Sequence, residues 1–331
     1  MFIKEYLMFL LKTLTVVTIT IVATFIYFCN KNKFKANQNN GKLIIKNLSY
    51  HYHKLKLHML ESAGTKGKIK NELQKHKTLL AAKKKEIHKK NVYVIQFNGN
   101  IKATAVDSLK KEITAILLIA NKKDNIILIL ESAGGTVSGY GLAASELARI
   151  KKKNIKLTVI VDKIAASGGY MMACIANEIL AAPFAIIGSI GVISQTPNFN
   201  QLLKKQGIKY EQITSGQYKR TLTMFGNNKD KDRKKMKEEL EAIHIQFKNL
   251  IKKQRPNVDI NIISTGEYWL AEKSKKLQLV DQLITSDEYL MALYETVNNI
   301  YYVEYKKKLT FVNKVSMLSQ YVKEFFNIKE V

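Results

Sequence analysis

The first candidate for chemistry in this 331-residue chain is a serine flanked by small residues, Ser167. It lies in the run Ala165-Ala166-Ser167-Gly168-Gly169, after one apolar segment and before another that is typical of a short helix. Small neighbours permit a sharp strand-to-helix turn that exposes a hydroxyl near helix N-terminal amides, as in a nucleophile elbow. A serine at this place is also a common helix N-cap. The residues alone leave both interpretations open.

A glycine pair, Gly134 and Gly135, follows another apolar run, in Glu131-Ser132-Ala133-Gly134-Gly135. Glycine lets the backbone turn its N–H groups outward without a Cβ in the way, and such donors can hold a developing oxyanion. A tight strand-to-helix turn is the commoner explanation of a glycine pair taken alone. Gly134, Gly135 and Gly168 are therefore candidate oxyanion residues.

The base that a serine nucleophile requires is not evident from local chemistry. Histidine is the usual partner, but in the part of the chain expected to be globular only His244 is available, within the charged helical segment of residues 234–253. A lysine can serve if burial lowers its pKa toward neutrality. Residue type alone cannot select one lysine among so many.

Composition argues against several other classes of function. The two cysteines, Cys29 and Cys174, are far apart, and the chain has no C-x-x-C or His-x-x-x-His pair, so we expect no disulfide framework, metal site or cofactor. The formal net charge of +27 could attract a polyanion. Nearly all of it is lysine, however, whereas recognition of phosphates and bases favours arginine. We therefore expect no nucleic-acid partner.

The pattern of the central region predicts an α/β fold. Three strand-like runs occur, one beginning at Val92, one at residues 126–131 and one at 157–161. Helical patterns at about 104–121 and 138–153 alternate with them. Continuous apolar runs are typical of strands buried on both faces of a parallel sheet. In such sheets functional groups gather at the carboxyl ends of the strands, where both glycine segments fall.

The amino terminus predicts a membrane anchor. Residues 13–29 are uncharged and, as a helix, extend about 25 Å, near the lower limit for crossing a bilayer. A cleaved signal peptide fits less well because no A-x-A-like site follows, and a buried soluble helix is the remaining alternative. Lysines after the run favour a cytoplasmic body, but long domains translocate largely regardless of charge, so the side stays open.

Four regions follow from this pattern: an anchor at 1–30, a basic spacer or stalk at 31–91, a catalytic domain at 92–297 and a basic tail or helix at 298–331. The spacer is rich in Lys, Asn, Gln and His, and we expect it to be solvated or to lie on anionic lipid headgroups. It holds five of the six histidines, which we expect to be solvated rather than catalytic.

Two longer motifs carry a resemblance to a known family. The segment DKIAASGGYMMACIANEILAAPFAIIGSIGVISQTPNFNQLL and the segment ITSGQYKRTLTMFG closely resemble the signal peptide peptidase A family of serine peptidases, and its SohB branch in particular. The resemblance covers roughly residues 92–290. It implies that Ser167 of S-G-G-Y is the nucleophile and that Lys219 of G-x-Y-K is the base. It also suggests that Ser189 orients Lys219, although a strand-end serine often bonds local backbone instead.

The resemblance further implies a crotonase-like fold of the Clp-protease type and a homo-oligomeric ring, an assembly that allows Ser and Lys to come from different subunits. Acyl-enzyme hydrolysis of unfolded or apolar peptides, with signal-peptide remnants as one candidate, would proceed at the bacterial inner membrane with the catalytic domain in the periplasm. One departure is Ala133, where the family usually has proline, which loosens the glycine loop. Two alternatives are an acyl-CoA enzyme of the same fold and a catalytically idle membrane scaffold.

Overall fold

The computed structural model describes residues 2–35, 41–64, 67–74, 90–297 and 299–307. In the first helix, side chains are described only for residues 5–20 and 24. The chain divides into two compact units, residues 1–43 with 305–331 and residues 44–304. All the candidate catalytic and oxyanion residues lie in the second unit.

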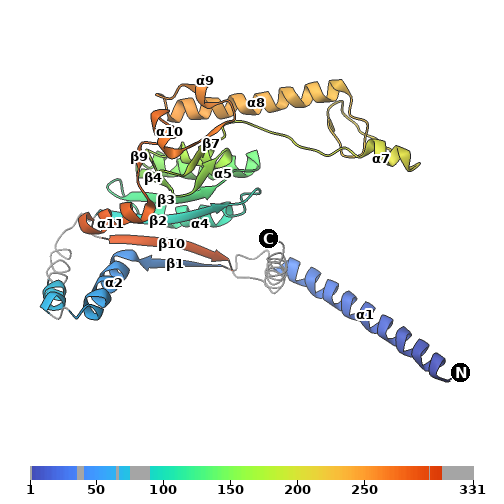
Figure 1. Cartoon of the computed structure of the whole chain (residues 1–331), viewed down its shortest axis with the longest axis horizontal. Coiled ribbons are helices and arrows are strands. Elements are labelled where there is room, and N and C mark those ends of the chain that lie inside the picture. The colour runs from blue at the N-terminus through green and yellow to red at the C-terminus, as the bar shows by residue number, and fades with distance from the viewer. Residues whose placement is uncertain (1, 36–40, 65–66, 75–89, 298, 308–331) are drawn as a thin grey trace. The chain divides into compact units, whose positions relative to one another are not determined.

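A parallel sheet forms the centre of the second unit (Figure 1). Its strands follow the order β10 (Asn299–Lys307), β2 (Asn91–Gly99), β3 (Asn125–Ser132), β4 (Lys156–Val161), β6 (Glu178–Ala181) and β9 (Gln282–Leu283), and each neighbouring pair is parallel. The apolar runs at 126–128 and 159–161 are fully buried, as expected for strands covered on both faces. The predicted α/β fold with a parallel sheet is confirmed.

Helices connect the parallel strands. The crossover connections contain α4 (Val106–Leu117) between β2 and β3, α5 (Val137–Lys152) between β3 and β4, and α11 (Ser286–Thr296) between β9 and β10. On α4, Leu109, Ile113 and Ile116 are buried at helical spacing, which explains its amphipathic sequence. Further helices of the catalytic region include α7 (Asn200–Lys205), α8 (Asp230–Gln254), α9 (Ile260–Ile263) and α10 (Ala271–Lys276).

Three short strands extend the sheet beside the candidate site. β5 (Ile164–Ala166) pairs with the end of β3 through Ser132 and Ala165, and with β7 (Ile186–Gly188). β7 in turn pairs antiparallel with β8 (Tyr268–Leu270). Helix α6 (Gly168–Ala173) begins directly after β5. Ser167 therefore occupies the junction between a strand and a helix.

Two segments expected outside the catalytic domain are ordered elements. Residues 41–62 form β1 (Gly41–Asn47) and α2 (Leu48–Ser62), and β1 lies next to β10 at the sheet edge. His53, expected to be solvated, is 5% exposed. The tail expected from residue 298 begins instead with β10, where Ile300 and Val303 are buried. Strand pairing joins segments far apart in the chain, so regular elements lie within the regions expected as spacer and tail. Residues 75–89 and 308–331 lie outside the described residues.

The apolar run at 13–29 lies within one continuous helix, α1 (Phe2–Lys35). Among the residues that the structure describes, no helix has both the length and the apolar character needed to cross a membrane. The predicted transmembrane helix is therefore not confirmed.

Candidate active site

Ser167 has an unusual backbone conformation. Its φ of 51° and ψ of −118° lie in a region that non-glycine residues rarely adopt, at a cost of about 1–3 kcal/mol that surrounding structure must offset. Two hydrogen bonds hold the turn: the Ser167 amide donates to the Gly188 carbonyl at 2.8 Å, and the Met171 amide donates to the Ser167 carbonyl at 2.9 Å. The Ser167 side chain makes no capping hydrogen bond. Ser167 thus stands at the N-cap position without using its hydroxyl as a cap.

The glycine loop packs directly against this turn. A Cβ placed on Gly134 would lie 2.7 Å from the Gly168 nitrogen and 2.8 Å from the Ser167 Cβ, and Gly134 has a φ of 92°. Only glycine fits this close approach and this backbone conformation. The structure therefore brings the two glycine segments together, as the sequence predicted for the ends of adjacent strands.

The amides of this loop differ in availability. The Gly134 amide donates to the Ser132 Oγ at 3.1 Å, whereas the amides of Gly135 and Gly168 make no hydrogen bond within the described residues. Two unpaired donors on segments that touch beside a serine could stabilise a negatively charged oxygen. Of the three candidate oxyanion residues, Gly135 and Gly168 have the free N–H groups.

A buried tyrosine supports both segments, and the sequence pattern did not single it out. Tyr140 is fully buried, its hydroxyl lies 2.5 Å from the Ser132 Oγ, and it donates to the Asn100 carbonyl at 2.9 Å. Its ring occupies the space that a Cβ on Gly168 would require. Burial raises the pKa of Tyr140, and its hydrogen bond with Ser132 opposes that shift only in part. The sequence signal that could have revealed it is an aromatic residue on the helix that follows the glycine pair.

Ser189 lies one residue beyond the carbonyl that accepts from Ser167. It also has a positive φ, 51°, and its amide donates to the Glu267 carbonyl at 2.6 Å. Its hydroxyl makes no hydrogen bond to Lys219 in this chain. The structure thus brings Ser189 to the strand beside Ser167 without giving it the predicted orienting contact.

Lys219 lies in a long connection between β7 and α8, which we call the connecting segment (residues 191–229). Its amide donates to the Gly216 carbonyl at 3.2 Å, and its side chain is exposed. Within the described residues, its ammonium group has no hydrogen-bond or ion-pair partner. The structure does not bring Lys219 together with Ser167 or Ser189 within one chain.

The ends of the connecting segment are held together by aromatic packing and amide hydrogen bonds. The Phe225 ring lies 6.2 Å from that of Phe199 and 5.7 Å from that of Tyr210, and the Asn200 side chain donates to the Phe225 carbonyl at 2.7 Å. Lys219 lies within the loop that these contacts close. Besides these three partly packed aromatic residues, exposed apolar side chains on this segment are Ile193, Leu202, Ile208, Ile213, Tyr218 and Met224.

Among the described residues, the other titratable groups offer no alternative base in contact with Ser167. Lys163, four positions before the serine, forms an exposed ion pair with Glu131 at 3.2 Å. His244 lies on α8, and its Nε2 has no hydrogen-bond partner among the described residues. That part of the chain also contains no group of three or more His, Cys, Asp or Glu residues able to hold a metal ion.

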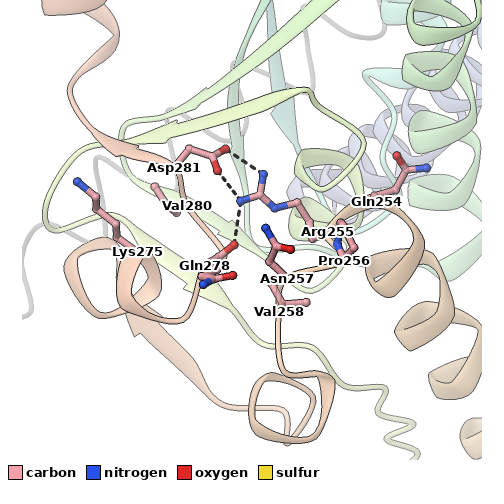
Figure 2. A pocket seen from close by; sticks show the side chains of 9 residues that line it. All are labelled: Gln254, Arg255, Pro256, Asn257, Val258, Lys275, Gln278, Val280 and Asp281. Atoms are coloured by element: carbon pink, nitrogen blue, oxygen red, sulfur yellow. Dashed lines mark hydrogen bonds and ion pairs between the residues drawn. The ribbon is translucent and has the colours of Figure 1, made fainter.

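A cavity of about 320 Å³ lies elsewhere, where α8 ends (Figure 2). The Arg255 guanidinium crosses it, donating to both carboxylate oxygens of Asp281 at 2.9 and 2.6 Å and to the Gln278 carbonyl at 2.8 Å. Burial opposes the charge of Arg255, but these contacts outweigh it and raise the pKa of the guanidinium. No candidate catalytic residue lines this cavity, so it is separate from the serine site.

Comparisons with known family models match both halves of the chain. The family model "Peptidase family S49" matches residues 149–299, and "Peptidase family S49 N-terminal" matches residues 1–147. A "Probable protease SohB" of Buchnera aphidicola subsp. Schizaphis graminum is 45% identical over 92% of this chain and 91% of its own length. A second, from Buchnera aphidicola subsp. Acyrthosiphon pisum, is 54% identical over 67% of this chain and 66% of its own length.

Among solved structures, a ClpP1 mutant from Listeria monocytogenes is similar with a TM-score of 0.38 and 14% identity, over 60% of this chain and 92% of that one.

Proposed function

The chain belongs to peptidase family S49 and to its SohB branch, and from that premise we propose that it is a membrane-anchored serine endopeptidase with Ser167 as nucleophile and Lys219 as base. The substrates are unfolded or apolar peptides, including signal-peptide remnants. Family membership makes it a protease. The catalytic residues, the anchor and the substrates form the proposal.

The observation that carries the proposal is the conformation of Ser167. A costly backbone geometry leaves its hydroxyl free of capping contacts at the start of a helix, beside the unpaired amides of Gly135 and Gly168. Strain of this kind persists only where the surrounding structure enforces it, and such residues cluster at active sites. A structural cap would instead bond its hydroxyl to a backbone amide of the helix.

The proposed reaction uses these groups in two stages. Neutral Lys219 removes the hydroxyl proton, Ser167 Oγ attacks the scissile carbonyl, and the Gly135 and Gly168 amides stabilise the oxyanion. The lysine proton passes to the leaving amine, and water then hydrolyses the acyl-enzyme, regenerating the serine. Every bond-making step uses groups of the protein and water.

Completion of the dyad across subunits is part of the proposal. Lys219 is exposed and unpaired in the single chain, and a lysine acts as a base only after burial disfavours its charge. The connecting segment also exposes apolar side chains, including Ile213 at 96%, and exposed apolar patches are typical of interaction surfaces. Docking of the connecting segment on a second copy would bury Lys219 and these apolar side chains, which favours a homo-oligomeric ring.

Peptide cleavage by three variants tests the proposal. We expect Ser167→Ala and Lys219→Ala each to abolish cleavage of fluorogenic peptides and unfolded protein by the full-length chain in mild detergent. Lys163→Ala is the matched lysine control, because its side chain pairs with Glu131 in solvent, and it should retain activity. The lack of contact between Lys219 and Ser167 in one chain favours a second candidate function, a catalytically idle scaffold. A scaffold predicts that neither the wild type nor any of the three variants cleaves the peptides.

The anchor is supported by how α1 satisfies its polar side chains. Five threonine hydroxyls of α1 each donate a hydrogen bond to a backbone carbonyl three or four residues earlier. They belong to Thr13, Thr15, Thr18, Thr20 and Thr24. Such bonds leave few side-chain donors to solvate, as a helix in lipid requires.

Alkaline carbonate extraction tests the anchor. The full chain should stay with membranes, and a chain lacking residues 2–35 should be released. Equal extraction of the two would show that α1 is not an anchor. A reporter fused after residue 307 would test the periplasmic side implied by the family resemblance.

A further inference from the structure

Four groups, three of them on buried residues, form a single directed chain of hydrogen bonds beside the serine site. Tyr140 has one hydroxyl proton and donates it to the Asn100 carbonyl at 2.9 Å. The 2.5 Å contact between Tyr140 and Ser132 must therefore be donated by the Ser132 hydroxyl. The Ser132 Oγ in turn accepts from the Gly134 amide at 3.1 Å. The chain runs from Gly134 through Ser132 and Tyr140 to Asn100.

The ring of Tyr140 supports the other side of the site. A Cβ on Gly168 would overlap the Tyr140 ring, so the backbone at the start of α6 lies directly on it. On its own side, the ring makes an edge contact with Phe97 at 6.3 Å between centroids. Tyr140 is 0% exposed to solvent. One rigid side chain therefore contacts both segments that carry the free amides.

The next residues fix the glycine loop at its far end. The Thr136 amide donates to the Ile101 carbonyl at 2.8 Å, so Gly135 lies between two attachments to residues 100–101. One attachment is direct, and the other passes through Tyr140 and Ser132. Loss of the second would leave the loop tied only at Thr136, while the Gly168 amide stayed in place.

From this geometry we propose that Tyr140 is a positioning residue for peptide hydrolysis: through Ser132 it sets the position of the Gly134–Gly135 backbone relative to Gly168. This inference rests on the proposed function. Because oxyanion donors act mainly in the transition state, loosening them lowers kcat with little change in KM. A displacement approaching 1 Å costs about 100-fold in rate, so a loosened loop should lose about 10- to 100-fold.

The test compares Tyr140→Phe with Tyr170→Phe in the full-length protein. Tyr140→Phe keeps the ring and removes the hydroxyl. Tyr170 is an equally buried tyrosine on α6 whose hydroxyl donates to the Leu279 carbonyl at 3.1 Å, away from the glycine loop. We expect Tyr140→Phe to lower kcat 10- to 100-fold with KM nearly unchanged, and Tyr170→Phe to keep the wild-type kcat.

A peptide aldehyde adds a readout that a merely structural role would not move. The Ser167 hydroxyl adds across the aldehyde carbonyl to give a reversible tetrahedral adduct, whereas a product peptide forms none. Tyr140→Phe should weaken aldehyde inhibition in proportion to kcat and leave product inhibition unchanged. Ser132→Ala, which breaks the same link, should reproduce both effects if Tyr140→Phe folds poorly.

The inference and the proposed function fail in different ways. Wild-type kcat and aldehyde inhibition in Tyr140→Phe would overturn the inference while leaving the Ser167 nucleophile intact. Amide hydrogen exchange of residues 132–136 provides a test independent of cleavage: Tyr140→Phe should speed exchange there, and Tyr170→Phe should not. Unchanged exchange in Tyr140→Phe would overturn the inference even if the chain proved inactive.

Discussion

The Ser167 amide donates to the Gly188 carbonyl at 2.8 Å, and this bond joins the candidate nucleophile to the strand that leads into Ser189. Both serines have a φ of 51°. Both serines therefore have a strained, positive φ, and the hydrogen bond from Ser167 to Gly188 joins their two turns. Lys219 makes no contact with either serine among the described residues of one chain. The first prediction therefore concerns how Lys219 reaches Ser167.

Mixing of inactive variants tests whether the dyad forms between subunits. Chains carrying Ser167→Ala and chains carrying Lys219→Ala should each be inactive, but co-expression should restore about a quarter of wild-type activity, because random ring assembly places an intact Ser167 beside a neighbour's intact Lys219 in that fraction of sites. Activity is measured with a fluorogenic peptide at matched oligomer concentration.

Co-expression of Ser167→Ala with the Ser167→Ala/Lys219→Ala double variant is the control and should give no activity. A dyad formed within one chain predicts that every mixture stays inactive.

The close fit of Gly134 predicts a strong effect of a single methyl group. Gly134→Ala places a Cβ 2.7 Å from the Gly168 nitrogen at a φ of 92°, and the backbone term alone costs about 1–2 kcal/mol. Peptidase activity should fall because the loop must move away from Gly168. Urea unfolding and kcat measure the two effects.

Gly141→Ala, in the neighbouring helix α5, is the matched control. A Cβ there meets no atom within 4 Å, so replacing an intrahelical glycine should stabilise the protein by about 0.5–1 kcal/mol without loss of activity. A Gly134→Ala protein as stable and active as Gly141→Ala would contradict the loop geometry.

Much of the candidate site could be predicted because its signals are local. The strand, the small residues and the glycines around Ser167 are contiguous in the sequence, so their pattern predicts a turn of the correct kind. The same holds for the loop at Gly134, because the ends of adjacent parallel strands meet at one edge of a sheet.

The residues that the sequence did not reveal depend on partners far away in the chain. Tyr140 matters through Asn100, 40 positions earlier, and no periodic pattern encodes that contact. Strand β10 pairs with β2 across more than 200 residues, as in the pairing of Tyr301 with Tyr93, and no local sequence pattern reveals that pairing. For the Lys219 ammonium group, the described residues of one chain supply no hydrogen-bond or ion-pair partner.

Stability should fall at alkaline pH because of a buried thiol. Burial raises the pKa of Cys174 from 9.0 to about 12. Between these values the unfolded chain releases the thiol proton while the folded chain keeps it, so this contribution is complete below pH 9 and is lost as pH rises, by about 1.4 kcal/mol per pH unit. The buried tyrosines Tyr140 and Tyr170 act in the same direction, since burial also raises their pKa values.

Urea unfolding at pH 8 and pH 10 measures this effect in the wild type and in Cys174→Ala. The variant is expected to be less stable at both pH values because it loses buried volume. The loss between the two pH values, however, should be smaller in the variant by about 1.4 kcal/mol. Equal pH-dependent losses would show that Cys174 does not titrate as its burial requires.

The Arg255 and Asp281 pair should stabilise the end of the helix that follows the connecting segment. Arg255 makes three hydrogen bonds there, two of them to one carboxylate (Figure 2). Asp281 also accepts from the Ile179 amide on β6 at 2.7 Å. Lysine keeps the charge but cannot make the paired contacts. Arg255→Lys should therefore cost about 1–3 kcal/mol, measured by urea unfolding.

Arg233→Lys is the matched control, because Arg233 pairs with Asp230 on the same helix at 2.9 Å with both side chains exposed, and exposed pairs contribute little. Its unfolding midpoint should stay near that of the wild type. Both variants should retain the Ser167-dependent activity at temperatures where they are folded, since neither arginine contacts the serine site. Equal stability of the two variants would mean that the paired hydrogen bonds of Arg255 contribute no more than a surface ion pair.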